Sequence, residues 1–222
     1  MTWIQLSGLY KKATRRLKAE WEILPYAGLR ASQRAAHYFT PHLPPPEALA
    51  FLDSLDCDHV EHAGKTLREH LINTYRLLDR WGNDRPTCLA GLFHATYGTS
   101  TLGGRLLELS ERERLRFVIG SEAEQLVYYY GLLDRAHLQA ACQGGDFFVR
   151  LRTTGDRVAL SQREFGQLAE IFLADRLEQI FMFNYRVRDQ SNDFFTQARP
   201  LLSDRAWADY CRAFPRRSSR AG

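Results

Sequence analysis

The helical spacing of apolar residues is what most constrains the fold of this 222-residue chain. In residues 65–81, apolar positions recur every three or four residues, as on one face of a helix, and Gly82 follows as a stop signal. This stripe consists of Leu67, Leu71, Thr74, Leu78 and Trp81. Further helices are predicted at about 3–21, 46–55, 86–97, 111–119, 121–134, 162–185, 192–198 and 203–213. The expected fold class is therefore mostly α.

A few local signals refine this pattern. Two short strand-like runs, Phe147–Leu151 and Arg157–Leu160, flank a turn that contains Gly155, which predicts one small β-hairpin at about 147–160. Two helix starts carry a serine followed three residues later by a glutamate, the pattern of a capping box. These pairs are Ser121 with Glu124 and Ser161 with Glu164.

Composition favours one globular domain. Hydrophobic residues make up 45% of the chain and are spread along it, which excludes a disordered protein. No run approaches the roughly 18 apolar residues that a membrane span needs. We expect an N-terminal helix and Pro-rich connector at 1–45, a main helical domain at 46–190, and short helices with a basic disordered tail at 191–222.

The net charge of +4 belongs to the ends of the chain. Residues 1–22 carry +3 and residues 212–222 carry +4, so the body between them is net negative. That body lacks the basic stripe typical of nucleic-acid-binding domains, and no nucleic-acid partner is indicated. The amphipathic segment 3–21 offers a basic face to a membrane surface, although packing on the domain is the favoured interpretation.

The cysteines indicate a reducing compartment. Cys57, Cys88, Cys142 and Cys211 form no C-x-x-C pair, which argues against a zinc ribbon or a thioredoxin-like site. The first twenty residues lack the uninterrupted apolar core of a secretory signal. We therefore expect four free thiols and a cytoplasmic location.

Histidines concentrate in one part of the chain. Four of the seven lie between residues 59 and 94, namely His59, His62, His70 and His94. His70 falls on the apolar face of the 65–81 helix, and His94 ends the run LAGLFH, in which Gly91 lets a neighbouring helix approach closely. Two imidazoles can therefore meet inside the bundle. The alternative is two core histidines, each hydrogen-bonded to a backbone carbonyl.

A carboxylate on the late helix extends this pattern. Asp175 lies among apolar residues of the 162–185 helix, where desolvation is costly unless a positive charge compensates it. An arginine such as Arg176, or a metal cation, would compensate. Together with His70 and His94, Asp175 would form a set for a divalent metal with positions left for water or substrate. These donors suit Mn, Zn, Mg or Fe without distinction.

The loop before the first of these helices offers a fourth ligand. His62 lies eight residues before His70, and Gly64 allows the loop to fold back toward the same place. His59 in the same loop is the other candidate.

These residues resemble the HD-domain superfamily of metal-dependent phosphohydrolases. His70, the histidine closing LAGLFH 24 residues later, and the late run ADRLEQ resemble most closely the hydrolase domain of the bacterial enzymes that degrade guanosine tetraphosphate. The runs HAGKTLREH (62–70) and AGLFHATYGT (90–99) also look like a small uncharacterised bacterial HD-like family. The resemblance covers about 60–180. It implies an HD-like helical bundle in which His70, His94 and Asp175 hold the metal.

The chain departs from the HD pattern at one defining position. Ala95 follows His94, so the aspartate that names the superfamily is absent, and Gly98 and Thr99 stand where the alarmone hydrolases carry a second carboxylate pair. Guanosine tetraphosphate hydrolysis and a bridged two-metal site are therefore not expected. A non-standard hydrolase of a small anionic substrate is the first expectation. The alternatives are a non-heme iron oxygenase with two histidines and one aspartate, and a degenerate HD-like domain that binds without catalysis.

Several neighbouring residues are candidates for supporting roles. Tyr97 and Thr99 would position the substrate, and Glu69 would act as a general base or support His70. Lys65 and Arg68 would meet an anionic substrate. The alternative interpretations are simple packing for the first two, and a solvated helix face for the three charged residues.

Overall fold

A computed structural model of the chain describes residues 42–62, 65–99, 104–135, 138, 141–142, 145–179 and 193–214. These residues belong to one compact unit, 41–222. The predicted helix at 3–21 and the basic tail after Phe214 lie outside the described residues. The boundary expected near residue 190 stays a prediction.

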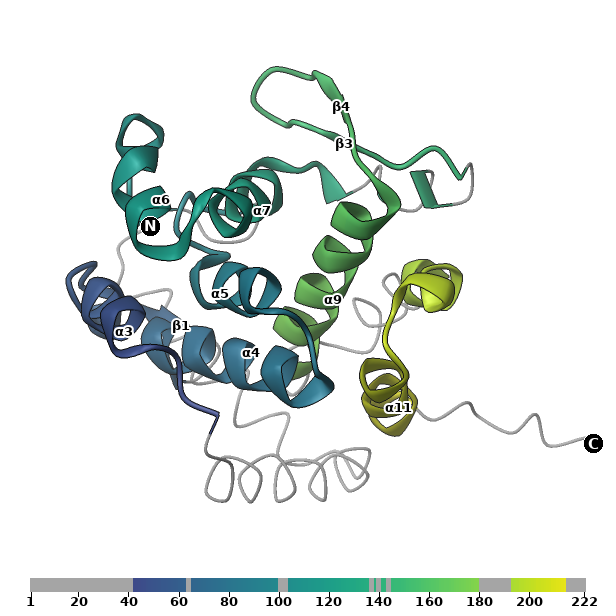
Figure 1. The fold of residues 1–222 in the computed structure, drawn as a ribbon, viewed down its shortest axis with the longest axis horizontal. Coiled ribbons are helices and arrows are strands. Elements are labelled where there is room, and N and C mark those ends of the chain that lie inside the picture. Colours follow the sequence, from purple (N-terminus) through teal and green to yellow (C-terminus); the bar gives the residue numbers. More distant parts are fainter. Residues whose placement is uncertain are drawn as a thin grey trace, which may run out of the picture. The chain divides into compact units, whose positions relative to one another are not determined.

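The described part of this unit is mostly helical (Figure 1). Its α-helices are α3 (Pro46–Asp53), α4 (Leu67–Trp81), α5 (Arg85–Phe93), α6 (Arg112–Ile119), α7 (Ser121–Leu132), α9 (Gln162–Glu178) and α11 (Asp204–Ala213). Three short 3-10 turns are η2 (Cys57–His59), η3 (Leu109–Glu111) and η5 (Arg199–Leu201). Two small antiparallel strand pairs complete the described elements.

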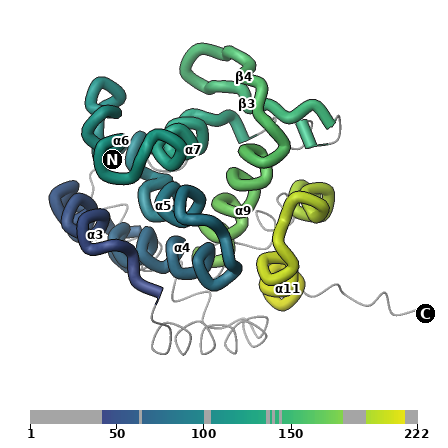
Figure 2. Tube along the Cα trace, in the orientation of Figure 1, coloured from purple at the N-terminus to yellow at the C-terminus, as the bar shows by residue number. Residues whose placement is uncertain are grey.

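Helix α5 lies at the centre of the bundle and packs against α4, α7 and α9 (Figures 1 and 2). Gly91 makes the contact with α4 close, because a Cβ at this position would lie only 2.2 Å from Leu78 Cδ1. This confirms the expectation that small residues in α5 let a neighbouring helix approach. The close α4–α5–α9 packing is what brings the candidate site residues together.

Helix α4 begins and ends with the signals that the sequence carries. The Thr66 side chain accepts a hydrogen bond from the Glu69 backbone, while the Glu69 carboxylate accepts one from the Thr66 backbone. Gly82 ends the helix in the left-handed conformation, with φ 87°. The stripe of the 65–81 region is buried, and His70 is buried with it.

The two predicted capping boxes have different outcomes. At α9, Ser161 and Glu164 form the reciprocal box as expected. At α7 the prediction is wrong, because the N-cap is Gly120, with φ 86°, and Ser121 is already inside the helix. Glu124 points into the core and makes ion pairs instead, since the arginine side chains of the preceding helix reach it.

Two helices end earlier than their apolar patterns predict. Helix α5 ends at Phe93 rather than at Tyr97, because residues 94–97 form a turn before Gly98, which has φ 76°. Helix α9, predicted to reach residue 185, ends at Glu178 with Gln179 as its C-cap, and residues 180–192 lie outside the described chain. His94 thus stands at the end of a helix, and Asp175 lies in the last turn of another.

The predicted hairpin is present, and a second strand pair was not expected. Strands β3 (Phe148–Arg150) and β4 (Arg157–Ala159) pair antiparallel, with Val149 opposite Val158. Strand β1 (Glu61–His62) lies in the segment predicted as a loop, and β2 (Lys65–Thr66) takes the first two residues of the predicted 65–81 helix, with His62 opposite Lys65. Each strand of this pair has only two residues, too few for a period-2 pattern to reveal. The pair places His62 beside the start of α4.

Two further expectations can be checked in the described residues. All four cysteines are free. Among the helices that the structure describes, none combines the length and the apolar character required to cross a bilayer.

Candidate metal centre

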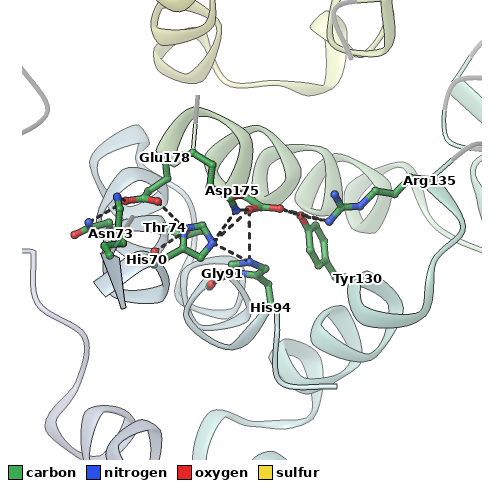
Figure 3. A network of polar contacts seen from close by, with 11 residues as sticks. His70, Asn73, Thr74, Gly91, His94, Tyr130, Arg135, Asp175 and Glu178 are labelled. Carbon is green, nitrogen blue, oxygen red and sulfur yellow. Dashed lines mark hydrogen bonds and ion pairs between the residues drawn. The ribbon is translucent and has the colours of Figure 1, made fainter. Parts of the chain in front are cut away.

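His70 from α4, His94 from the turn that follows α5, and Asp175 from α9 meet in the core (Figure 3). His70 Nε2 lies 3.3 Å from His94 Nε2 and 3.3 Å from Asp175 Oδ1, while His94 Nε2 lies 3.8 Å from the same oxygen. All three residues are buried, with exposed fractions of 0%, 2% and 6%. The structure thus brings these three residues together, and their role as metal ligands stays a prediction.

The spacing of these three atoms suits a single cation. A triangle with these sides has a circumradius of about 2.0 Å, and protein nitrogen and oxygen ligands bind zinc at about 2.0–2.2 Å. One point therefore lies at bonding distance from all three atoms without any movement of the side chains. His70, His94 and Asp175 could hold a divalent metal ion.

Hydrogen bonds on the far side of each imidazole fix which nitrogen is free. His70 Nδ1–H donates to Glu178 Oε2 at 2.6 Å, and His94 Nδ1–H donates to the Gly91 carbonyl at 2.8 Å. In both rings the lone pair of a neutral imidazole is therefore on Nε2, the atom that faces Asp175. A carboxylate behind one ligand and a carbonyl behind the other are the partners that metal-binding histidines ordinarily have.

Glu178 is held in place by groups of its own. Lys65 Nζ makes an ion pair with its Oε1, and Asn73 Nδ2 donates to the same oxygen at 3.0 Å. Burial raises the pKa of Glu178, but the hydrogen bond and the charge of His70, together with Lys65, outweigh burial and lower it. Glu178 is therefore an ionised carboxylate fixed behind His70.

The two carboxylate oxygens of Asp175 face different groups. Oδ2 accepts a hydrogen bond from Tyr130 Oη at 2.5 Å and lies 3.4 Å from Arg135 Nη2. Burial alone would raise the pKa of Asp175, but the hydrogen bond from His70 and the nearby positive groups hold it well below its usual range. The sequence suggested an arginine such as Arg176 to compensate this carboxylate; the ion pair that the structure shows is with Arg135, and Oδ1 is left to face the two histidines.

The two histidines differ in basicity although their rings are adjacent. Burial lowers the pKa of His70, but hydrogen bonds to Asp175 and Glu178 outweigh burial and raise it to about 9. His94 has no carboxylate behind it, and burial lowers its pKa to about 4. One positive charge between His70 and Asp175 is thus favoured, and His94 stays neutral.

The structure separates the two candidates for a fourth ligand. The His62 ring lies 4.6 Å from the His70 ring, and its Nε2 is buried without a hydrogen-bond partner in the described chain. It lies outside the group of converging ligand atoms, so its role as a ligand stays a prediction. His59 is far more exposed, with 82% of its side chain accessible, and it lies 3.4 Å from Asp56. The structure does not bring His59 to this site.

The charged candidates at the start of α4 have separate partners. Lys65 reaches the site through Glu178, as described above. Arg68 pairs with Asp53 at 2.7 Å on the surface, and Glu69 is exposed and caps α4. The proposed roles of all three toward substrate stay predictions.

Tyr97 and Thr99 follow the site along the chain. Tyr97 is fully buried, and its hydroxyl donates to Glu124 Oε1 at 2.9 Å. Arg112 holds the same carboxylate through two hydrogen bonds, at 2.6 and 2.8 Å. Thr99 is also buried, with 9% exposed. Tyr97 therefore connects the segment after His94 to α7, and a catalytic role for it or for Thr99 stays a prediction.

Four residues of the site were not found by sequence reasoning. They are Tyr130, Arg135, Glu178 and Gln179. The signal for two of them was present, since Glu178 and Gln179 lie three and four residues after Asp175 and so share its side of the helix. Tyr130 gives no such signal, because its ring is apolar and only its hydroxyl reaches Asp175.

Comparisons with known proteins agree with this fold. A family model described as a domain of unknown function (DUF6817) matches residues 51–135, a range that includes both histidines and ends before Asp175. No curated protein matches the chain. A solved structure, described as a metazoan ortholog of SpoT that hydrolyzes ppGpp, is similar at 14% identity with a TM-score of 0.51. The match covers 79% of this chain and 97% of that chain, and it confirms the predicted fold class, a mostly α HD-like bundle.

Proposed function

We propose that the chain is a divalent-metal-dependent hydrolase of the HD type that acts on a small anionic substrate. The observation that carries this proposal is the convergence of His70 Nε2, His94 Nε2 and Asp175 Oδ1 around one point at bonding distance from all three. The fold supports it, because a protein with a similar bundle is described as hydrolysing ppGpp. When bound, a divalent cation supplies a Lewis acid that activates water near neutral pH.

The residues around the ligands keep the site ready for the cation. Glu178 holds the proton of His70 on Nδ1, so that Nε2 stays available as a ligand. Tyr130 and Arg135 hold Asp175 by Oδ2, so that Oδ1 points to the imidazoles. With the hydrogen bond from His94 Nδ1–H to the Gly91 carbonyl, these contacts fix three ligand orientations before the metal arrives, which reduces the entropy lost on binding.

The charge balance of the site favours an anionic substrate. Two carboxylates, Asp175 and Glu178, are matched by two cations, Lys65 and Arg135. With both imidazoles neutral, the cluster carries no net charge, so a divalent metal would bring it to +2. In a buried site such a charge attracts phosphate or carboxylate groups strongly. A small phosphorylated, nucleotide-like substrate fits this balance.

Ala95 makes the chemistry differ from that of the HD pattern. Its buried methyl group neither binds a metal nor transfers a proton, so the position after His94 adds no ligand. We therefore propose a single cation rather than a bridged pair, and a substrate other than guanosine tetraphosphate.

Metal analysis with turnover assays tests this proposal. The purified chain should contain close to one equivalent of metal and release phosphate from at least one member of a panel of nucleotides, pyrophosphate and ppGpp. His94→Ala and Asp175→Asn should lose both properties. His59→Ala and Asp204→Asn are matched controls, since those side chains are 82% and 93% exposed.

The outcomes separate the proposed function from its alternatives. Iron with oxygen-dependent turnover would favour the oxygenase, whose ligand set of two histidines and one carboxylate is the same. Stoichiometric metal without turnover on any substrate would favour a binding domain. A chain that binds no divalent metal would overturn the proposal.

A further inference from the structure

Gln179 places its carboxamide among the candidate ligand atoms. It is the C-cap of α9, four residues after Asp175, and only 9% of it is exposed. Its Nε2 donates to Asp175 Oδ1 and lies 3.2 Å from His70 Nε2. We propose that Gln179 is a fourth protein ligand of this centre, through Oε1. This inference rests on the proposed metal dependence of the chain.

The position of this carboxamide fits a coordination shell. In a tetrahedral site with bonds of about 2.0–2.1 Å, neighbouring ligand atoms lie about 3.3–3.4 Å apart. The carboxamide nitrogen lies 3.2 Å from His70 Nε2, close to the 3.3 Å that separates His70 Nε2 from His94 Nε2. The contact with Asp175 Oδ1 is closer, as a hydrogen bond requires, so Gln179 lies beside the candidate ligand atoms and would coordinate only after its carboxamide turns.

The amide of Gln179 has a donor end and an acceptor end, so the side chain can interact with the site both without and with a bound cation. Without a cation, the N–H end satisfies the Asp175 oxygen, which can only accept when it is ionised. Beside a cation the same N–H would point a positive dipole at a positive charge. A half-turn about the last side-chain torsion exchanges Nε2 for Oε1 and leaves the aliphatic stem in place, so a lone pair faces the metal instead.

The ligand set that results is compatible with several divalent metals. Two imidazole nitrogens, one carboxylate oxygen and one amide oxygen make a mixed set without sulfur. Carbonyl and carboxylate oxygens suit Mn²⁺ and Mg²⁺, and imidazole suits Zn²⁺ and Fe²⁺. An amide oxygen is neutral and exchanges more readily than a carboxylate, so a substrate oxygen could displace it.

Two substitutions distinguish a ligand from a structural hydrogen bond. In Gln179→Glu the head loses its N–H, gains charge and presents an oxygen at both ends. In Gln179→Leu the head has no donor or acceptor at all. If Gln179 is a ligand, the two variants should change metal affinity in opposite directions. If Gln179 only supports Asp175, both variants should bind metal more weakly. Gln162→Glu is the matched control, because it makes the same charge change at the exposed start of the same helix.

Calorimetric titration of Mn²⁺ and Zn²⁺ into EDTA-treated protein, with folding checked by circular dichroism, measures these effects. Relative to wild type, we expect the Kd of Gln179→Glu to fall about tenfold and that of Gln179→Leu to rise about tenfold, with Gln162→Glu unchanged. If wild type binds metal but both Gln179 variants bind it more weakly, or neither changes, this inference is overturned and the proposed function stands. If wild type binds no metal, both are overturned.

Discussion

The Nε2 atoms of His70 and His94 lie 3.3 Å apart in the core, although His70 lies on α4 and His94 in the turn that follows α5. Each ring donates its Nδ1–H away from this space, His70 to Glu178 and His94 to the Gly91 carbonyl. Two neutral imidazoles held in this way direct lone pairs toward the same space, and Asp175 adds a third. Only a positive species between them makes the arrangement favourable, and that species is either a proton on His70 or a metal ion.

This competition gives the metal-free protein a specific dependence of stability on pH. The pKa of His70 is raised to about 9 from an ordinary value of 6.5, so its stabilising contribution is fully present below pH 6.5 and is lost as the pH rises through 9. The free energy of unfolding of EDTA-treated protein should therefore fall by up to about 3 kcal/mol between pH 6.5 and 9. Urea titrations at successive pH values measure this.

The metal-loaded protein should lack that decline. A cation on Nε2 takes the place of the proton, so raising the pH no longer removes a positive charge from the site. Metal binding at pH 7 should also release close to one proton, which calorimetry in buffers of different ionisation enthalpy detects. Metal-free His70→Gln, which has no imidazole here, should show no such alkaline slope. If the free energy of unfolding of the wild-type protein falls equally with pH in the metal-free and metal-loaded forms, the assignment of the alkaline decline to His70 is contradicted.

Glu178→Gln should weaken metal binding about tenfold, because the amide still accepts the Nδ1 proton of His70 but no longer carries the charge that makes Nε2 a strong ligand. The substitution also leaves Lys65 without its counter-ion, which should lower stability measurably. Glu108→Gln serves as the control, since that side chain is 65% exposed. Unchanged metal affinity in Glu178→Gln would show that this carboxylate has no part in the site.

The sequence was most informative for residues whose position on a helix follows from the apolar pattern and the helix caps. Apolar spacing and caps predicted α4 and α9, and the inward positions of His70 and Asp175 followed from them. His94 was predicted from the small-residue run before it, although the helix ends at Phe93 and the histidine lies in the turn beyond. These three candidate ligands could be predicted because each lies on, or next to, a strongly patterned helix.

The other residues of the site are brought together by contacts between distant segments, which the spacing of residues along the sequence does not encode. Arg135 reaches Asp175 from the segment that follows α7, and nothing in the sequence around it marks that long-range pairing. Glu124 was predicted as a cap from its position three residues after Ser121, but Gly120 starts the helix one residue earlier and turns the carboxylate inward. A local motif failed there because tertiary ion pairs outweighed it.

Gly91→Ala should destabilise the chain by about 1–2 kcal/mol. The added methyl group meets Leu78 Cδ1 at 2.2 Å, so either the leucine changes rotamer or α5 moves away from α4. The better helix propensity of alanine, worth up to about 1 kcal/mol, offsets part of this effect. Chemical denaturation measures the change, and Gly104→Ala, where a Cβ meets nothing within 4 Å, should fall within about 0.5 kcal/mol of wild type.

Glu124→Gln should be among the most destabilising single changes in the bundle. The carboxylate is fully buried, with Arg112 bound through two hydrogen bonds and Arg116 Nη2 at 3.1 Å. Removing the negative charge leaves the partly buried Arg112 guanidinium without its counter-ion, a situation that costs up to about 3–5 kcal/mol, whereas Arg116 keeps its ion pair with Glu113. The hydroxyl of Tyr97 also loses a charged acceptor.

The effect of this substitution should extend to the metal site through the chain after His94. Tyr97 lies three residues after that histidine, so loosening its hydrogen bond to Glu124 frees the turn that orients the imidazole. We expect metal affinity to fall by a few fold in Glu124→Gln even under conditions where the protein stays folded. Glu122→Gln, on the same helix with 47% of its side chain exposed, should leave both stability and metal affinity near wild type. A stability loss with unchanged affinity would mean that the turn is fixed by α5 alone.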